Sequence, residues 1–315
     1  MRFDILTIFP DFFAGIFEHG IVRRAQAEGL VTIETHDLRN FTHDRHRTVD
    51  DRPFGGGEGM VLKPEPLAEA LGALGVTPKP SELGNMGTRE RKNRDQGSEI
   101  RDQEAGNREQ GIGNRDQKTQ VILLSAQGRP FNQLLARQFA TLDRIVLVCG
   151  RYEGVDERIN QLYCDMELSI GDYILSGGEL AAAVVVDAVM RLIPGVLGNE
   201  ASGEFESFGV ADSEIDVDID GVPRSQHGAG GLLDYPHYTR PADFAGLRVP
   251  EVLMNGDHHA IRRWRREQQL RKTLANRPDL IDRAALSADD RKLLESIRAS
   301  LTASIPESIP HEEQE

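Results

Sequence analysis

Apolar runs and amphipathic stretches alternate along the first 78 residues of the chain. Residues 3–9 and 31–33 have the apolar character of strands, and residues 11–28 between them have the spacing of one helix, closed by Gly29. Residues 64–74 predict another helix, with a proline near its start, where a missing N–H does no harm. This order of elements predicts an α/β fold.

The same alternation resumes after residue 120. The predicted strands are 121–124, 145–149 and the residues near Leu168, and the predicted helices are 131–142, the segment after Val155, and 178–191. Continuous apolar strands between amphipathic helices are typical of a parallel sheet that is covered on both faces. Two further helical patterns, at 257–275 and 287–301, predict a small helical domain at the C-terminal end.

Two polar segments interrupt this pattern. Residues 81–118 contain near-repeats of the type Asn-Arg-Asp-Gln and bury too little apolar surface to offset the entropy of ordering, so we expect a disordered insertion. Its eight basic residues are matched by eight acidic ones, which disfavours an arginine-rich RNA-binding tail. Residues 199–232 are acidic and contain glycine, as in a flexible interdomain linker. We therefore expect one domain at 1–198 and a second at 233–315 that ends in a disordered tail.

The net charge of −14 over 315 residues argues at first against a nucleic-acid partner, which normally requires excess lysine and arginine. Seven acidic residues in 203–221 and four in the tail after residue 305 account for most of this charge and leave −3 elsewhere. Two basic clusters remain, so RNA or DNA stays open. No apolar run reaches the ~18–20 residues of a membrane helix, and two cysteines without a leader make the cytoplasm the expected compartment.

Three glycine-containing loops each follow a predicted strand, at residues 125–128, 150–154 and 170–178. In open α/β sheets, ligands bind at the carboxyl ends of the strands, and glycine lets backbone amides approach a ligand closely. The loops therefore predict one shared pocket, although each of them is equally consistent with a tight turn.

The sequence lacks the common nucleotide and metal motifs. It contains neither G-x-G-x-x-G nor G-x-x-x-x-G-K-[ST], so dinucleotide and P-loop sites lose support, whereas a different adenosine ligand remains open. It contains no H-E-x-x-H and no C-x-x-C, and the pairs His43/His46 and His258/His259 are more typical of surface or RNA-facing residues than of zinc ligands. Cys149 ends an apolar strand and is interpreted as a core residue. We expect no metal site.

Two segments carry side chains suited to RNA. The connection at residues 41–60 is too aromatic and too glycine-specific for plain disorder, and long loops of this kind are usually functional. Residues 261–266 place four arginines around Trp264, the only tryptophan, on a predicted helix. Phosphate contact combined with stacking is a natural use of that set, and the alternative is a solvated helix face on which Trp264 anchors the helix in the core.

Several long motifs resemble those of the bacterial tRNA (guanine-37-N1) methyltransferases, the TrmD family of the SPOUT superfamily. The matching segments are 39–60, 148–158 (Val-Cys-Gly-Arg-Tyr-Glu-Gly-Val-Asp-Glu-Arg), 169–179, 194–198 (Pro-Gly-Val-Leu-Gly) and 234–241 (Asp-Tyr-Pro-His-Tyr-Thr-Arg-Pro). The resemblance spans the chain except residues 81–118, about 209–228, and the extreme tail.

The resemblance implies a SPOUT-type parallel sheet with a C-terminal trefoil knot, followed by a small helical domain. It also implies a homodimer with active sites shared between the chains, tRNA as partner, and S-adenosylmethionine bound in the knot, with no DNA and no membrane partner. The matching cofactor positions are Leu123, Leu124, Gly150, Tyr152, Glu153, Ile170, Gly171, Tyr173, Leu175, Gly177 and Gly178. The expected tRNA contacts are His43, Arg45, His46, Arg52, Gly59, Asp234, His237, Arg262 and Arg265. Mg²⁺ is plausible at RNA phosphates, but no ligand set in the sequence indicates it.

Methyl transfer to guanine N1 requires two groups from the protein. N1 carries a proton at neutral pH, so a base must take that proton and a donor must stabilise the charge that develops on O6. The family's arginine corresponds to Arg191 in this chain. The family's general base, an aspartate, corresponds to Glu206, which keeps the carboxylate but adds a methylene. Asp212 and Asp234 are rival carboxylates for the base.

We therefore expect an S-adenosylmethionine-dependent enzyme that makes 1-methylguanosine at position 37 of tRNA, next to the anticodon, where guanosine 36 precedes it. Two alternatives stay open. One is another SPOUT RNA methyltransferase with a different target, and the other is a non-catalytic RNA-binding relative, which the change from aspartate to Glu206 could suggest.

Overall fold

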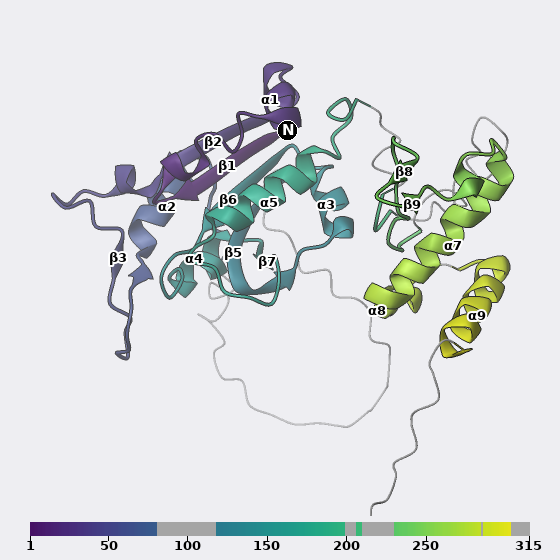
Figure 1. The fold of residues 1–315 in the computed structure, drawn as a ribbon. Coiled ribbons are helices and arrows are strands. Elements are labelled where there is room, and N and C mark those ends of the chain that lie inside the picture. The colour runs from purple at the N-terminus through teal and green to yellow at the C-terminus, as the bar shows by residue number, and fades with distance from the viewer. Residues whose placement is uncertain (81–117, 199–205, 210–229, 285, 304–315) are drawn as a thin grey trace, which may run out of the picture. The chain divides into compact units, whose positions relative to one another are not determined.

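A computed structural model describes residues 1–80, 118–198, 206–209, 230–284 and 286–303 (Figure 1). It divides the chain into two compact units, Met1–Val196 and Leu197–Glu315. The insertion expected at 81–118 lies outside the described residues except for Lys118, as do most of the expected linker and the end of the tail.

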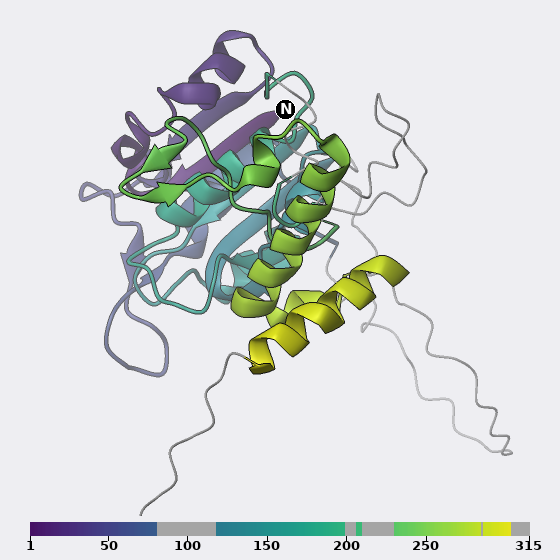
Figure 2. The ribbon, with the colours of Figure 1, turned by 45° about the vertical axis from the view of Figure 1, so that its right-hand side comes forward.

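The first unit is built on a five-stranded sheet in the order β2-β1-β6-β5-β7. All of its strand pairs are parallel, and Figure 2 shows the strands lying side by side. The strands are β1 (Arg2–Thr7), β2 (Thr32–Asp37), β5 (Thr119–Pro130), β6 (Arg144–Cys149) and β7 (Met166–Ser169). The predicted α/β fold with a parallel sheet is confirmed.

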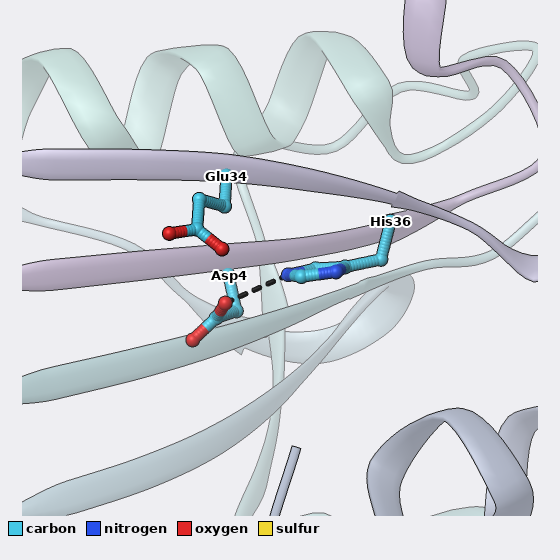
Figure 3. Close-up of side chains that lie close together, drawn as sticks. All are labelled: Asp4, Glu34 and His36. Carbon is cyan, nitrogen blue, oxygen red and sulfur yellow. Dashed lines mark hydrogen bonds and ion pairs between the residues drawn. The ribbon is translucent and has the colours of Figure 1, made fainter. Parts of the chain in front are cut away.

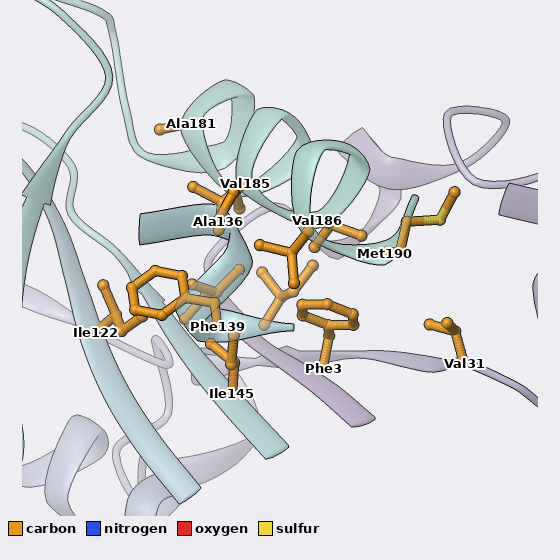
Figure 4. Close-up of a cluster of buried hydrophobic side chains, with 14 of the residues drawn as sticks. Phe3, Val31, Ile122, Ala136, Phe139, Ile145, Ala181, Val185, Val186 and Met190 are labelled. Atoms are coloured by element: carbon orange, nitrogen blue, oxygen red, sulfur yellow. The ribbon is translucent and has the colours of Figure 1, made fainter. Parts of the chain in front are cut away.

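Helices cover both faces of the sheet. Successive side chains of each strand point to opposite faces, so both faces are apolar and both need a covering layer. Phe3 and Ile5 of β1 pack with α1 (Gly20–Ala27), α3 (Gln133–Phe139) and α5 (Glu179–Met190). Leu6 packs on the opposite face with α2 (Pro64–Ala73) and α4 (Glu157–Tyr163). Figure 4 shows apolar side chains of α5 resting on those of the strands. Cys149 is 1% exposed, which confirms it as a core residue, and burial raises the pKa of its thiol well above the usual value.

The expectation of one helix over residues 11–28 is wrong. The structure has a 3-10 turn, η1 (Pro10–Phe13), and a separate helix, α1. Gly15 and Gly20 have φ angles of +85° and +59°, a left-handed conformation that interrupts the helix between the two elements. The helical spacing was present, but the backbone geometry of two glycines overrode it.

The chain around the predicted loop 41–60 contains short elements that the sequence pattern did not indicate. A 3-10 turn, η2 (Leu38–Phe41), precedes the loop, and β3 (Asp50–Asp51) pairs antiparallel with β4 (Val61–Leu62). Strand β5 is also longer than the predicted 121–124. Its last residues, Arg129 and Pro130, pair with β7 after an irregularity, so that β7 contacts β5 on both sides of residues 125–128.

The second unit is mainly helical. It contains α7 (His258–Asn276), α8 (Pro278–Ile281), α9 (Ala288–Ala303), the 3-10 turn η5 (Glu251–Leu253) and a hairpin of β8 (Asp243–Phe244) and β9 (Leu247–Arg248). Leu232, Leu270 and Ile297 belong to its core. The Asp257 side chain caps α7 by accepting from the backbone N–H groups of His259 and Ala260. Among the described residues, no helix combines the length and apolar character needed to cross a membrane.

Candidate cofactor and RNA site

The three glycine loops come together at the carboxyl end of the sheet. Residues 125–128 lie within β5, residues 150–154 follow β6, and residues 170–178 follow β7. The Gly178 N–H donates to the Gly150 carbonyl oxygen at 2.9 Å, and Arg151 pairs with Gly177 in an isolated antiparallel bridge. Loops 150–154 and 170–178 are therefore neighbours in the fold, as the hypothesis of a shared pocket requires.

Glycine is required where these backbones cross. A Cβ on Gly178 would lie 2.8 Å from the Cys149 Cα, and a Cβ on Gly128 would overlap the backbone of Glu167 and Leu168. Neither Gly128 nor Gly178 has a positive φ, so close approach rather than backbone conformation excludes a side chain at these positions. The sequence pattern placed Gly128 in a glycine loop but did not indicate this close approach.

The predicted cofactor residues all lie on these loops or in β5 directly before residues 125–128. Leu123 and Leu124 are buried there, whereas Tyr152 and Tyr173 are each 54% exposed. Tyr152 has a φ of +57°, and burial together with the neighbouring Asp50 carboxylate raises the pKa of its hydroxyl. The Tyr173 ring contacts Gly171, where a Cβ would overlap it. The other predicted positions, Gly150, Glu153, Ile170, Leu175, Gly177 and Gly178, occupy the same two loops, 150–154 and 170–178.

Part of the loop 41–60 packs beside the second glycine loop. The Glu153 N–H donates to the Met60 carbonyl oxygen, and the Leu62 N–H donates to the Gly154 carbonyl oxygen, both at 3.0 Å. A Cβ on Gly59 would overlap the Glu153 side chain. The structure thus brings a residue predicted for RNA, Gly59, against one predicted for the cofactor, Glu153.

The remaining predicted RNA contacts of this loop are exposed side chains: His43, Arg45, His46 and Arg52. His43 is paired with Glu69 at 2.8 Å. The Asp44 carboxylate accepts from the backbone N–H groups of His46 and Thr48, which orders the turn that carries Arg45 and His46.

The predicted catalytic residues lie in different units. Arg191 is the C-terminal cap of α5 and is half-buried, and Glu206 belongs to the second unit, where it is also half-buried. Ser207, the residue after Glu206, accepts a hydrogen bond at its Oγ from the Asp234 backbone N–H at 2.9 Å. This bond holds Asp234, the rival carboxylate, next to the residue that follows Glu206, whereas Asp212 lies outside the described residues.

Aromatic and charged side chains gather around the start of α7. The Arg265 guanidinium lies over the Tyr235 ring at 4.8 Å, and the Tyr238 and Trp264 ring centroids are 6.2 Å apart. Asp234 pairs with His237 at 2.9 Å. The structure thus brings the predicted RNA residues Asp234, His237 and Arg265 into one cluster.

Arg266 has a different role from the one expected for the four arginines of residues 261–266. Its guanidinium binds both carboxylate oxygens of Asp290, at 2.8 and 2.9 Å, and the two side chains are 13% and 11% exposed. Burial alone would raise the pKa of the Asp290 carboxyl, but the bonds from Arg266 hold it below its usual value. Arg266 therefore fastens α7 to α9 and is not available to phosphate.

Comparison with known proteins places this geometry in a family. The profile of "tRNA (Guanine-1)-methyltransferase TrmD" matches residues 1–86 and 107–283. A protein of Koribacter versatilis, named tRNA (guanine-N(1)-)-methyltransferase, is 52% identical over 299 residues, 95% of this chain and 99% of its own length. Proteins of the same name from Dehalococcoides mccartyi and Chloroflexus aggregans are 43% and 46% identical over 95% and 90% of this chain, and over 98% and 89% of their own lengths.

The chain belongs to the TrmD family. The resemblance read from the sequence motifs is confirmed. The TrmD profile contains all three glycine loops, the loop 41–60 and the whole of α7, and it leaves out residues 87–106 of the expected insertion and the last 32 residues. The matched region therefore includes every predicted site residue.

One group of side chains in this TrmD-family chain has the spacing of a metal site. Ligand atoms of Asp4, Glu34 and His36 lie within 4.8 Å of one another on β1 and β2 (Figure 3). The Asp4 carboxylate, however, already accepts from His36 at 2.7 Å, from Arg2 at 2.9 Å and from Arg144 at 2.7 Å. Two guanidinium groups at the same carboxylate would repel a cation, so we interpret the group as a charge network that joins three strands.

Asp4 is expected to stabilise the fold through this network. Burial alone would raise the pKa of the Asp4 carboxyl, but hydrogen bonds from His36, Arg2 and Arg144 hold it well below its usual value. Its contribution is therefore complete above the unfolded-state pKa of about 4 and is lost as the pH falls below that value.

Asp4→Asn should lower the free energy of unfolding at neutral pH by ~3 kcal/mol, because it removes the charge of a buried partner. Glu34, which is 46% exposed, provides the control, and Glu34→Gln should change stability by less than ~1 kcal/mol. Urea unfolding at pH 7 and pH 3 measures both. A loss for Asp4→Asn that is equal at the two pH values would contradict the role of the charge.

Proposed function

We propose that this chain transfers a methyl group from S-adenosylmethionine to N1 of guanosine 37 in tRNA, where guanosine 36 precedes it. The observation that carries the proposal is its near full-length match to the Koribacter versatilis relative, whose name states transfer to guanine N1 of tRNA. The contact between glycine loops 150–154 and 170–178 at the carboxyl end of a parallel sheet supports it.

The glycine loops fit S-adenosylmethionine as a ligand. Loops 150–154 and 170–178 lie side by side at the carboxyl end of the sheet, and Tyr152 and Tyr173 offer exposed rings. The bound sulfonium would supply the electrophilic methyl group. The residues of this chain would hold and orient the cofactor so that the methyl group lies in line with guanine N1.

We assign a trefoil knot to residues 119–191. The support for this assignment is the way β5 meets β7 both before and after residues 125–128, together with the return of residues 177–178 to the backbone at Cys149 and Gly150. The domains in the proposal are a methyltransferase domain at 1–198, a linker at 199–232 and a tRNA-binding domain at 233–315.

Glu206 and Arg191 are the proposed catalytic residues. Glu206 would accept the N1 proton, and Arg191 would donate to O6 as negative charge develops there. The proposal places both residues in an active site shared between the chains of a homodimer, as the family resemblance implies.

Exposed apolar side chains support a dimer through α5. Leu180 and Val184 lie one turn apart on α5 and are 48% and 46% exposed, and η1, which packs against α5, adds Phe12 at 36%. Val184→Glu should convert the protein into a monomer and abolish methylation, because an unpaired charge would then be buried in the interface. Analytical ultracentrifugation measures the first effect, and Val22→Ala, a buried position, is the control for general destabilisation. A dimeric Val184→Glu variant would exclude this surface.

The proposed tRNA contacts are those named from the sequence: His43, Arg45, His46, Arg52 and Gly59 in the first unit and Asp234, His237, Arg262 and Arg265 in the second. Mg²⁺ bound to RNA phosphates is compatible with the proposal. We assign it no protein ligands among the described residues. We place the enzyme in the cytoplasm with its substrate, and the proposal includes no DNA or membrane partner.

Arg265→Ala is expected to weaken tRNA binding and to lower the salt dependence of the binding constant by about one unit, the effect of one lost phosphate contact. S-adenosylmethionine binding should not change. Arg266→Ala is the matched control: it should reduce the free energy of unfolding by ~3 kcal/mol by leaving Asp290 unpaired, without the same change in salt slope. Filter binding over a salt series separates the two, and an unchanged slope for Arg265→Ala would mean that this arginine contacts no phosphate.

The experiment that tests the proposed function is methylation of an unmodified tRNA transcript, with the product identified as 1-methylguanosine by mass spectrometry. A transcript with adenosine at position 37 is the control and should not react. A different SPOUT methyltransferase would modify both transcripts at another position, and a non-catalytic relative would bind both transcripts without modifying either.

A further inference from the structure

A chain of three side chains joins the end of β1, the loop after β6 and the start of α5. Glu179, the first residue of α5, is 1% exposed. Its Oε1 accepts from Thr7 Oγ1 at 2.7 Å, and its Oε2 accepts from Arg151 Nε at 2.9 Å and forms an ion pair with Arg151 Nη2, also at 2.9 Å. Thr7 ends β1, Arg151 follows β6, and Glu179 follows the loop after β7. We call this group the Thr7–Glu179–Arg151 clasp.

We propose that Glu179 is a positioning residue that acts through Arg151 to fix the distance between loops 150–154 and 170–178, and so sets the affinity for S-adenosylmethionine. This inference rests on the proposed function, since these loops are the proposed cofactor site. No role for Thr7, Arg151 or Glu179 followed from the sequence analysis. The sequence signal for such a role is an acid that directly follows Gly177-Gly178 at the start of a largely apolar helix.

Arg151 is fully engaged inside the protein. Besides its two bonds to Glu179, its Nη1 donates to the Ser176 carbonyl oxygen at 3.1 Å, and its guanidinium lies 4.6 Å from the Phe9 ring centroid. The side chain is 17% exposed. An arginine whose Nε, Nη1 and Nη2 all have protein acceptors is a poor candidate to bind a phosphate or the cofactor's carboxylate, so its role is to hold the loops.

The clasp also explains why glycine occupies position 177. A Cβ there would overlap the Arg151 side chain, so the guanidinium fills the space that a side chain would take. Arg151 therefore packs on the backbone of loop 170–178 and hydrogen-bonds to it at the preceding residue. Movement of Arg151 would change the spacing of the two loops directly.

The burial of the Arg151–Glu179 ion pair indicates that the pair fixes the geometry of the loops rather than adding to the stability of the fold. The α5 N-terminus favours the negative charge of Glu179 through the helix dipole. Desolvation of both charges nevertheless offsets much of their attraction, and an apolar pair of similar volume is often as stable. A hydrogen-bonded ion pair differs from an apolar pair in that it holds its two partners at one distance and one orientation.

The test separates positioning from stability with three variants: Glu179→Gln, Arg151→Met and the double variant. Each single variant leaves a buried charge unpaired and should lower the thermal midpoint, whereas the double variant removes both charges and should recover most of it. Gln keeps the Oε1 acceptor for Thr7. If the clasp positions the loops, S-adenosylmethionine affinity should stay at least ~10-fold weaker in all three variants, since small displacements in a binding site are costly.

Calorimetry with S-adenosylmethionine measures the affinity, and steady-state kinetics should show a raised KM for the cofactor with kcat and the KM for tRNA nearly unchanged. Arg158→Met is the matched control. Arg158 pairs with Asp156 in the same region but is 63% exposed, and its loss should leave cofactor affinity unchanged.

Wild-type affinity in the double variant would overturn the inference, because the clasp would then act on stability alone. Should a single variant fail to fold, Arg151→Lys decides: it keeps the charge but cannot bind Glu179 and Ser176 together, and an unchanged affinity overturns the inference. Absence of S-adenosylmethionine binding by the wild-type protein would instead overturn the proposed function, and the inference with it.

Discussion

Glu206→Gln is expected to lower single-turnover methylation of tRNA by at least ~10²-fold, the range that general-base catalysis contributes. Glutamine keeps the size of the side chain and removes its ability to accept the N1 proton. Binding of tRNA and of S-adenosylmethionine should stay near wild type, because the carboxylate acts mainly in the transition state. Rapid-quench assays with saturating enzyme measure the chemical step, and calorimetry measures both affinities.

Glu206→Asp is the matched control, since aspartate stands at this position in the family pattern. It should retain or raise activity, because a carboxylate is a weak base and its placement matters more than its basicity. The rival assignments predict a different result. If Glu206→Gln is near wild type while Asp234→Asn or Asp212→Asn binds normally and does not react, the base is that residue and Glu206 is not catalytic.

Gly177→Val is expected to lower S-adenosylmethionine affinity by at least ~10²-fold while the protein stays folded. Any Cβ at this position overlaps the Arg151 side chain, so valine would displace the guanidinium that packs between loops 150–154 and 170–178, the proposed cofactor site. The φ of Gly177 is not positive, so valine meets no backbone strain there, and Arg151 is a side chain that can move. Calorimetry and thermal unfolding measure the two effects.

Gly72→Val provides the control for the valine itself. Gly72 lies in α2, and a Cβ there meets nothing within 4 Å. This variant should bind S-adenosylmethionine as the wild type does. Unchanged affinity in Gly177→Val would remove loop 170–178 from the cofactor site, whereas an unfolded Gly177→Val protein would show that position 177 is required for the fold itself.

The sequence by itself determined the sheet. Apolar runs at 121–124 and 145–149 lie in β5 and β6, where Ile122, Leu147 and their neighbours are fully buried. Burial on both faces demands apolar residues at consecutive positions, so the pattern alone identifies parallel strands between helices. The family was also readable, because its motifs are long runs of adjacent residues. Glycine after each strand pointed to the end of the sheet where the loops meet.

Only the tertiary structure decided how individual polar side chains are used. Nothing in the sequence distinguishes Arg266, which is bound to Asp290, from Arg265 one residue earlier, which stacks on Tyr235. The pairing of Arg151 with Glu179 joins residues 28 positions apart, and the bond from Thr7 spans 172. Hydrophobic periodicity reports which face of an element is buried. The partner of a buried charge depends on which distant segments the fold brings within hydrogen-bonding distance, and no local pattern records that.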